Sequence, residues 1–141
     1  MAKNAQSPQH TFGWIPAVAL CLIITGMSHQ TIDGADIYYF PHQDKVIHAL
    51  VYGLIATTWL RWLTTFKTEF KAALWAITLT STFGVIDEVH QSFVPGRYLD
   101  FFDWVADTAG ATLATFCYLK WPLYRNILEW PKKPKQSGPR A

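Results

Sequence analysis

The sequence predicts an all-α, polytopic membrane protein with four transmembrane helices and both termini in the cytoplasm. Of its 141 residues, 50% are hydrophobic and 16% aromatic, while only 16% are charged. Soluble domains usually carry about 25% charged residues, and tryptophan and tyrosine gather at membrane interfaces. Four apolar segments of about 17 to 21 residues, near the lower limit for a membrane-spanning helix, follow one another along the chain.

The expected spans are residues 12–28 (FGWIPAVALCLIITGMS), 46–63 (VIHALVYGLIATTWLRWL), 70–86 (FKAALWAITLTSTFGVI) and 101–121 (FFDWVADTAGATLATFCYLKW). None alternates with the period of a strand. The first has no charge on any face, whereas each helix of a soluble bundle, the main competing fold, would show a polar face. A cleaved signal peptide is a second alternative for this segment, but only Lys3 precedes it and no clear cleavage site follows. Pro16 falls in its first turn, which tolerates proline.

Lysine and arginine indicate the orientation. With a cytoplasmic N-terminus and four crossings, ten of the twelve basic residues lie on the cytoplasmic side, and only Lys45 and Arg97 face outward. Eight of the ten acids lie on or near the outer side. We therefore expect a cytoplasmic tail over residues 1–11, a four-helix membrane domain over residues 12–121, and a basic cytoplasmic tail rich in proline and lysine over residues 122–141.

The two cysteines argue against a CxxC motif and a disulfide, and the net charge argues against a nucleic-acid-binding protein. Cys21 and Cys117 form no CxxC pair. Their predicted depths differ by more than about 10 Å at a rise of about 1.5 Å per residue, so we expect no disulfide between them. The net charge of +2 is too small to imply nucleic-acid binding. The sequence does not predict the oligomeric state.

Polar residues converge at the outer ends of three predicted helices. Residues spaced three or four apart share a helix face; these sets are Asp44, His48 and Tyr52 in the second helix, Asp87, His90 and Gln91 in the third, and Asp103, Asp107 and Gly110 in the fourth. An aspartate at the centre of a membrane helix costs about 3 kcal/mol, so we expect the face of Asp103 and Asp107 to look inward. Pro95 and Gly96 signal a tight turn between the third and fourth helices, and Gly110 and Ala114 have the spacing of a close helix contact.

These residues predict an outer-leaflet polar pocket whose chemistry could take three forms. The candidates are His48, Glu88 and Asp103 as catalytic groups; Asp44, Lys45, Tyr52, Gln91 and Arg97 as ligand-binding groups; and Asp87 and Asp107 as ligands of a divalent metal. A neutral imidazole can act as a general base, arginine can bind a phosphate bidentately, and carboxylates suit divalent cations. The alternative is a buried structural network without a ligand, and Glu88 and His90 could equally face water.

Two blocks of this sequence, DKVIHALVYGLIA and IDEVHQSFVPGRYLDFFDWVADTAGA, resemble the VanZ-like family of small bacterial membrane proteins. The matching positions are Asp44, Lys45, His48, Tyr52, Glu88, Gln91, Pro95, Arg97, Asp103 and Gly110. One departure is Asp107, where the family often has asparagine. The resemblance implies a helical protein of the bacterial cytoplasmic membrane. The family takes its name from a protein associated with low-level resistance to teicoplanin, a glycopeptide antibiotic that acts on cell-wall precursors.

The leading hypothesis is a site for an anionic, lipid-linked molecule of the cell envelope, held by Lys45 and Arg97 with a divalent metal on the acids. A first rival is a hydrolase or transferase that acts on such a lipid with His48 as base. A second is a noncatalytic accessory or assembly protein whose polar residues are structural. A proton or ion path is not supported, because the inner halves of the predicted helices lack acids.

Overall fold

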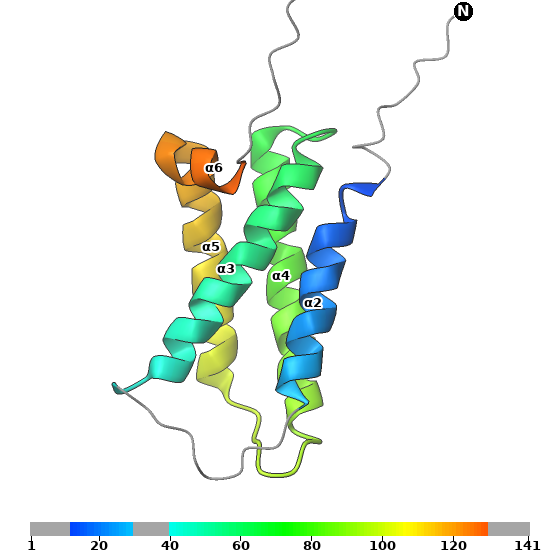
Figure 1. Cartoon of the computed structure of the whole chain (residues 1–141), viewed down its shortest axis with the longest axis vertical. Helices are drawn as coiled ribbons and strands as arrows, with labels where there is room; N and C mark the ends of the chain where they lie inside the picture. The colour runs from blue at the N-terminus through cyan, green and yellow to red at the C-terminus, as the bar shows by residue number, and fades with distance from the viewer. Residues whose placement is uncertain (1–11, 30–39, 130–141) are drawn as a thin grey trace, which may run out of the picture.

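The computed structural model describes residues 12–29 and 40–129, which form helices and no strand. The helices are α2 (Ile15–Ser28), α3 (Gln43–Leu63), α4 (Glu69–Gln91), α5 (Phe101–Lys120) and α6 (Pro122–Leu128). Helices α2 to α5 run up and down beside one another, and α6 folds back across the end of α5 (Figure 1). The four predicted segments therefore correspond closely to four helices.

Local sequence signals set the helix ends. Pro16 occupies the first turn of α2, as expected. Asp100 caps α5, since its side chain accepts a hydrogen bond from the Phe102 backbone N–H at 2.8 Å. Between α4 and α5 the backbone N–H of Arg97 donates to the Val94 carbonyl at 3.1 Å, and Gly96 has a φ of 82°, which a glycine adopts readily. The predicted Pro95–Gly96 turn is confirmed.

Helices α3 and α5 pack most closely, along a seam of small residues. A Cβ placed on Gly110 would lie 2.0 Å from the backbone oxygen of Ala49, and a Cβ on Gly53 would lie 3.0 Å from the Cβ of Ala114. The close contact predicted from Gly110 and Ala114 is confirmed. It brings the polar faces of the two helices together.

The outer surface of the bundle is apolar. Large hydrophobic side chains on its outer faces include Leu22, Leu50, Leu113 and Phe116, each more than 60% exposed. Two helices, α3 and α4, are long and apolar enough to cross a membrane. Such a surface indicates a membrane or partner interface.

The other two predicted spans have features that set them apart. With 14 residues, α2 is about 21 Å long, shorter than a typical span. Helix α5 has 20 residues and carries both Asp103 and Asp107. Four crossings with cytoplasmic termini therefore remain a prediction.

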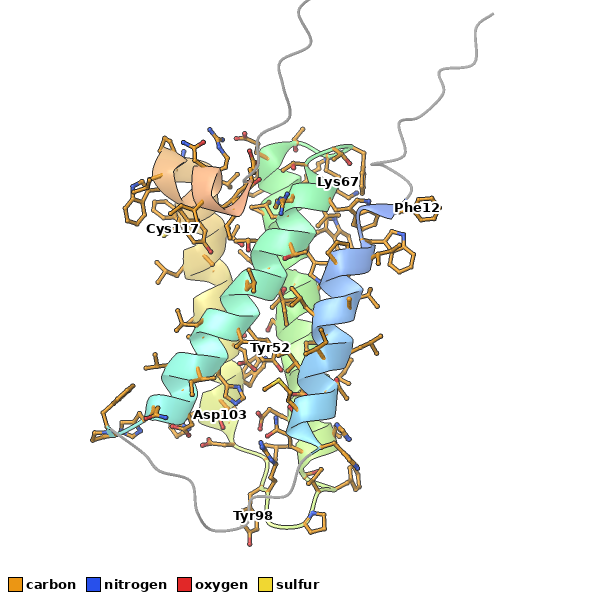
Figure 2. The ribbon with its side chains drawn as sticks, viewed as in Figure 1. Phe12, Tyr52, Lys67, Tyr98, Asp103 and Cys117 are labelled. Carbon is orange, nitrogen blue, oxygen red and sulfur yellow. The ribbon has the colours of Figure 1, made fainter. Side chains whose placement is uncertain are left out.

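Charges separate along the bundle axis. The end that carries the α3–α4 connection and α6 holds Lys67 and Cys117, whereas Asp103 and Tyr98 lie toward the opposite end and Tyr52 lies between (Figure 2). The described basic residues other than Lys45 and Arg97 belong to the first end: Arg61, Lys67, Lys71, Lys120 and Arg125. Most described acids belong to the second end, which we call the polar end.

Several predictions fall in or near segments outside the described residues. Lys3, Asp33, Asp36 and the last twelve residues lie there. The predicted cytoplasmic tail begins at residue 122, and residues 122–128 form α6, in which Pro122 occupies the first turn. Cys21 and Cys117 are free, which agrees with the predicted absence of a disulfide between them.

Candidate functional site

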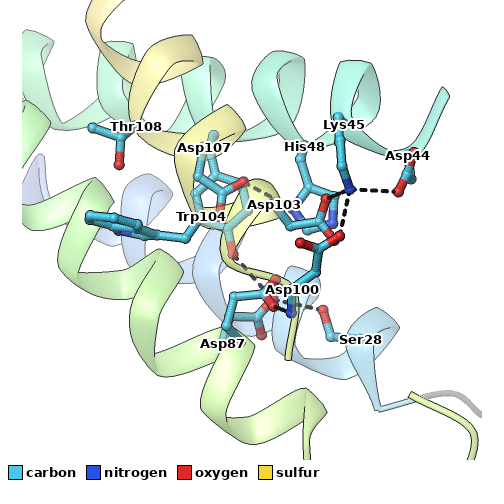
Figure 3. A network of polar contacts seen from close by, with 12 residues as sticks. Ser28, Asp44, Lys45, His48, Asp87, Asp100, Asp103, Trp104, Asp107 and Thr108 are labelled. Atoms are coloured by element: carbon cyan, nitrogen blue, oxygen red, sulfur yellow. Dashed lines mark hydrogen bonds and ion pairs between the residues drawn. The ribbon is translucent and has the colours of Figure 1, made fainter. Parts of the chain in front are cut away.

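Lys45 stands at the centre of the more exposed part of the polar end. Its ammonium donates to Asp44 at 3.0 Å and to Asp100 and Asp103 at 2.7 Å each (Figure 3). We call these four residues the lysine cluster. The three contacts match the three hydrogens of an ammonium group. The side chains of Lys45, Asp100 and Asp103 are 23%, 41% and 14% exposed, so this cluster is partly open to its surroundings.

Asp100 joins three parts of the site. Its carboxylate caps α5 and binds Lys45, and its backbone N–H donates to Glu88 Oε2 at 2.9 Å. The hydrogen bond from Lys45, followed by the one from the Phe102 N–H, lowers the pKa of the Asp100 carboxyl below its usual value. The short connection between α4 and α5 is thereby fixed against α3.

Beneath the lysine cluster lies a second group, the buried acid cluster of His48, Asp87, Glu88 and Asp107. Asp107 is 0% exposed, Asp87 1% and Glu88 3%. His48 Nδ1 lies 2.9 Å from Asp107 Oδ1. Because an ionised carboxylate only accepts hydrogen bonds, this contact assigns the Nδ1 proton to His48.

Asp87 accepts more hydrogen bonds from the described residues than the other buried acids do, and all of them reach one oxygen. Its Oδ2 accepts hydrogen bonds from Ser28 at 2.9 Å, Tyr52 at 3.1 Å and Gln91 at 3.0 Å. The Gln91 side-chain oxygen in turn accepts from Arg97 Nη1 at 3.2 Å. Four segments, α2, α3, α4 and the α4–α5 connection, are thus tied together through Asp87.

One oxygen of each buried acid has no partner. Asp87 Oδ1, Glu88 Oε1 and Asp107 Oδ2 are buried and accept no hydrogen bond from any described residue. Buried carboxylate oxygens are normally paired, and an unpaired one is costly. The buried acid cluster is therefore short of donors or cations.

Glycine and aromatic residues shape the walls of the buried acid cluster. A Cβ on Gly84 would lie 2.8 Å from Asp107 Oδ2, so the absence of a side chain leaves room for this carboxylate between α4 and α5. The Tyr52 ring stacks on His48 and on Phe83, with centroids 5.9 and 5.6 Å apart. Trp104 closes the side toward α4, where its Nε1 donates to the Ser81 hydroxyl at 3.1 Å.

An open apolar groove runs along the outer face of α5 beside the polar end. It has a volume of about 640 Å³ and is lined by Trp104, Val105, Thr108, Ala109, Thr112, Leu113 and Phe116. Trp104 and Thr108 point away from the carboxylates of Asp103 and Asp107, which precede them in the sequence (Figure 3). The groove and the polar clusters thus lie on different faces of the first turns of α5.

The structure brings all ten predicted site residues into these two connected clusters. Asp44, Lys45 and Asp103 lie in the lysine cluster; His48, Glu88, Asp87, Asp107, Tyr52, Gln91 and Arg97 lie in or against the buried acid cluster. Glu88 is buried rather than facing water. His90 turns toward α2 instead, where its ring stacks on His29 at a centroid distance of 5.4 Å.

Ser28 and Asp100 belong to the site but were not among the predicted site residues. Asp100 directly precedes an apolar helix, and this position favours an N-cap aspartate, so the sequence held a signal for it. Ser28 ends an apolar run and carries no such signal. Its contact with Asp87 depends on how α2 docks against α4.

The long apolar helices, the exposed apolar faces and the buried charges at one end together indicate a helical membrane protein. The chain belongs to the VanZ/LLP1 family, whose sequence profile matches residues 4–125. The resemblance in the two polar blocks is thereby confirmed. No curated protein and no solved structure is significantly similar to the chain.

Proposed function

We propose that the chain is a four-span protein of the bacterial cytoplasmic membrane, with cytoplasmic termini, whose polar end binds the headgroup of an anionic, lipid-linked envelope molecule. The unpaired buried oxygens carry this proposal. Three carboxylate oxygens without a donor among the described residues lie in this one cluster, and each of them costs stability in a network that only holds helices together. Hydroxyl groups of a bound headgroup, or a cation bound with it, would supply the missing partners.

The two cations of the polar end have different parts in this proposal. Lys45 already donates to three carboxylates, so it serves mainly to hold Asp44, Asp100 and Asp103 together. Arg97 Nη1 donates to Gln91 at 3.2 Å, which places its guanidinium beside the buried acid cluster, and the planar fork of a guanidinium fits a phosphate. Arg97 is therefore the residue that we assign to the anionic group.

The apolar groove on α5 supports a lipid-linked ligand. It begins at Trp104, next to the polar end, and continues along the helix to Phe116. Over 12 residues this is a length of about 18 Å, enough for much of an acyl or prenyl chain. A headgroup at the polar clusters would thus have its chain in reach of the groove.

The test uses the full-length protein purified in detergent and transferred to nanodiscs. Binding of a polyprenyl phosphate is measured by native mass spectrometry against the uncharged polyprenol. We expect the phosphate to bind preferentially and Arg97→Gln to weaken it about tenfold, as for the loss of one charge-assisted hydrogen bond. Arg61→Gln, at the opposite end of the bundle, is the control and should bind as wild type does.

Equal binding of phosphate and polyprenol, or equal binding by wild type and the Arg97 variant, would refute the anionic ligand. The noncatalytic accessory or assembly role is the alternative in that case. It predicts a protein that binds neither lipid and in which the polar clusters only fix the helix positions.

The contact between His48 and Asp107 favours a catalytic version of the same function. A buried carboxylate that orients an imidazole through Nδ1 leaves Nε2 as a general base, which could activate water or a hydroxyl toward a phosphate. In this version wild type releases phosphate from the bound lipid and His48→Gln binds the lipid but releases none.

A further inference from the structure

Three helices each contribute one metal-ligating side chain to the centre of the buried acid cluster. His48 of α3, Glu88 of α4 and Asp107 of α5 offer one ligand atom each, and these atoms lie within 4.8 Å of one another. Two of the three are almost wholly buried, with Glu88 3% and Asp107 0% exposed. Residues that are 40 and 19 positions apart in the chain thus meet at one point.

Each of the two acids has one unpaired oxygen. Glu88 Oε2 accepts from the Asp100 N–H and Asp107 Oδ1 contacts His48, while Glu88 Oε1 and Asp107 Oδ2 have no donor among the described residues. Two carboxylates this deeply buried repel one another unless a cation or protons compensate them. The unpaired oxygens therefore point to a bound positive charge.

A second group of three acids shows what a compensated cluster looks like in the same protein. Asp44, Asp100 and Asp103 also bring their oxygens within 4.8 Å of one another. The Lys45 ammonium lies among them at 2.7 to 3.0 Å. The centre of that group is filled by the protein itself, whereas no described lysine or arginine forms an ion pair with Glu88 or Asp107.

We propose that His48, Glu88 and Asp107 form a binding site for a divalent transition-metal ion, Mn²⁺ or Zn²⁺. Carboxylates suit Mn²⁺, and imidazole with carboxylates suits Zn²⁺; Ca²⁺ and Mg²⁺ prefer all-oxygen sets. Ligands of a tetrahedral zinc lie about 3.4 Å apart for bonds of about 2.1 Å, so ligand atoms at the 4.8 Å limit would have to close in by about 1.4 Å. Asp87, which the sequence analysis gives as a metal ligand, is not one of these three residues, and its Oδ2 accepts hydrogen bonds from Ser28, Tyr52 and Gln91.

This site goes beyond the proposed function, because it binds metal whether or not a lipid is present. It is an alternative to the version in which His48 is a general base, because an imidazole nitrogen that binds a metal cannot also accept a proton. Three protein ligands leave coordination positions open, as in catalytic metal sites. Gly84 leaves room for this site, because a side chain there would contact Asp107 Oδ2. An open position could take a phosphate oxygen, which would let an acid-rich site bind an anion.

The experiment uses the full-length protein in detergent, stripped with a chelator, freed of polyprenyl phosphate and dialysed against Mn²⁺. We expect one tightly bound Mn²⁺ per chain by electron paramagnetic resonance, with a nitrogen coupling from an imidazole, and displacement by Zn²⁺. His48→Gln should abolish the nitrogen coupling, and Asp107→Asn should weaken binding by at least about tenfold. Glu69→Gln, an exposed acid at the opposite end of α4, is the matched control and should bind as wild type does.

A thermal-unfolding scan of each variant without metal separates loss of the site from loss of the fold. Asp107→Asn removes an uncompensated buried charge, so its metal-free midpoint should equal or exceed that of wild type, while the rise on adding Mn²⁺ disappears. The inference is overturned if wild type binds no stoichiometric Mn²⁺ or Zn²⁺, if no nitrogen coupling is present, or if Glu69→Gln weakens binding as much as Asp107→Asn.

The two proposals fail separately. Lipid binding is measured in nanodiscs with the chelator present as well as with Mn²⁺, whereas metal binding is measured without lipid. Lipid binding without stoichiometric metal overturns the metal site and leaves the proposed function intact. Metal binding without a preference for polyprenyl phosphate overturns the proposed function and leaves the metal site intact.

Discussion

Gly110 is the single residue on which the contact between α3 and α5 most depends. A Cβ at this position would lie 2.0 Å from the Ala49 backbone oxygen, a distance that only a shift of one helix can relieve. The neighbouring Asp107 would move with α5, so its contact with His48 would change as well. The smallest side chain is therefore enough to disturb both the packing and the site.

We predict that Gly110→Ala destabilises the protein by about 1 to 3 kcal/mol or more, as overpacking in a close-packed core does. Unfolding of the purified protein in a denaturing detergent measures the change. Gly26→Ala is the control, because a Cβ on Gly26 meets nothing within 4 Å. That variant should match wild type or be slightly more stable, and an equally small effect of Gly110→Ala would contradict the close contact.

Among the described helices, α5 is the one whose start and docking both depend on a single residue, Asp100. Asp100 caps its N-terminus and binds Lys45 of α3, so one carboxylate both starts the helix and docks it. The short α6 follows its other end, where Tyr118 donates to Glu129 at 2.5 Å. Pro122 is a sequence signal for the start of α6, but seven residues are too few to show the hydrophobic periodicity of a helix.

We predict that acid weakens the docking of α5 through Asp100. Its pKa is lowered in the folded protein, so the stabilisation is complete above the usual carboxyl pKa of about 3.9 and is lost as the pH falls through the folded value. The thermal midpoint of wild type should therefore fall more steeply below about pH 4 than that of Asp100→Asn. Asparagine keeps the cap but not the ion pair.

Asp100→Ala separates the two parts of this effect. It removes the cap as well as the ion pair, so its midpoint should already be lower than that of Asp100→Asn at pH 7, by the equivalent of about 1 kcal/mol. Identical acid profiles for wild type and Asp100→Asn would show that the ion pair with Lys45 does not contribute to docking.

At the scale of the whole molecule, charge separation supports the predicted orientation. The basic residues at the end of the α3–α4 connection lie opposite the polar end (Figure 2). An excess of lysine and arginine marks the cytoplasmic side of a membrane protein. The polar end should therefore face outward, where an envelope molecule is accessible.

We predict that a cysteine placed at Tyr98 reacts with a membrane-impermeant maleimide in intact spheroplasts, whereas one placed at Lys67 reacts only after permeabilisation. Tyr98 is 86% exposed and lies at the polar end; Lys67 lies at the other. The native Cys21 and Cys117, both free, are first replaced by alanine. Labelling of Lys67→Cys in intact spheroplasts would show that the orientation is the reverse of the predicted one.

The amino-acid sequence was sufficient to predict the four long helices, their apolar faces and ten of the residues that meet at the polar end. Spacings of three and four along a helix fix which side chains share a face, and a charged face in an apolar helix must turn inward. All ten predicted site residues therefore lie together in the structure.

The contacts between these side chains depend on how the helices pack in three dimensions. Helical spacing does not fix the depth or rotation of neighbouring helices, and hydrogen bonds depend on both to within a fraction of an ångström. The structure therefore placed Lys45 among Asp44, Asp100 and Asp103, joined Ser28 to Asp87, and left oxygens of Glu88 and Asp107 unpaired. Because charge alone would have paired Lys45 with any of the acids, the proposed metal site could be located only after these contacts were known.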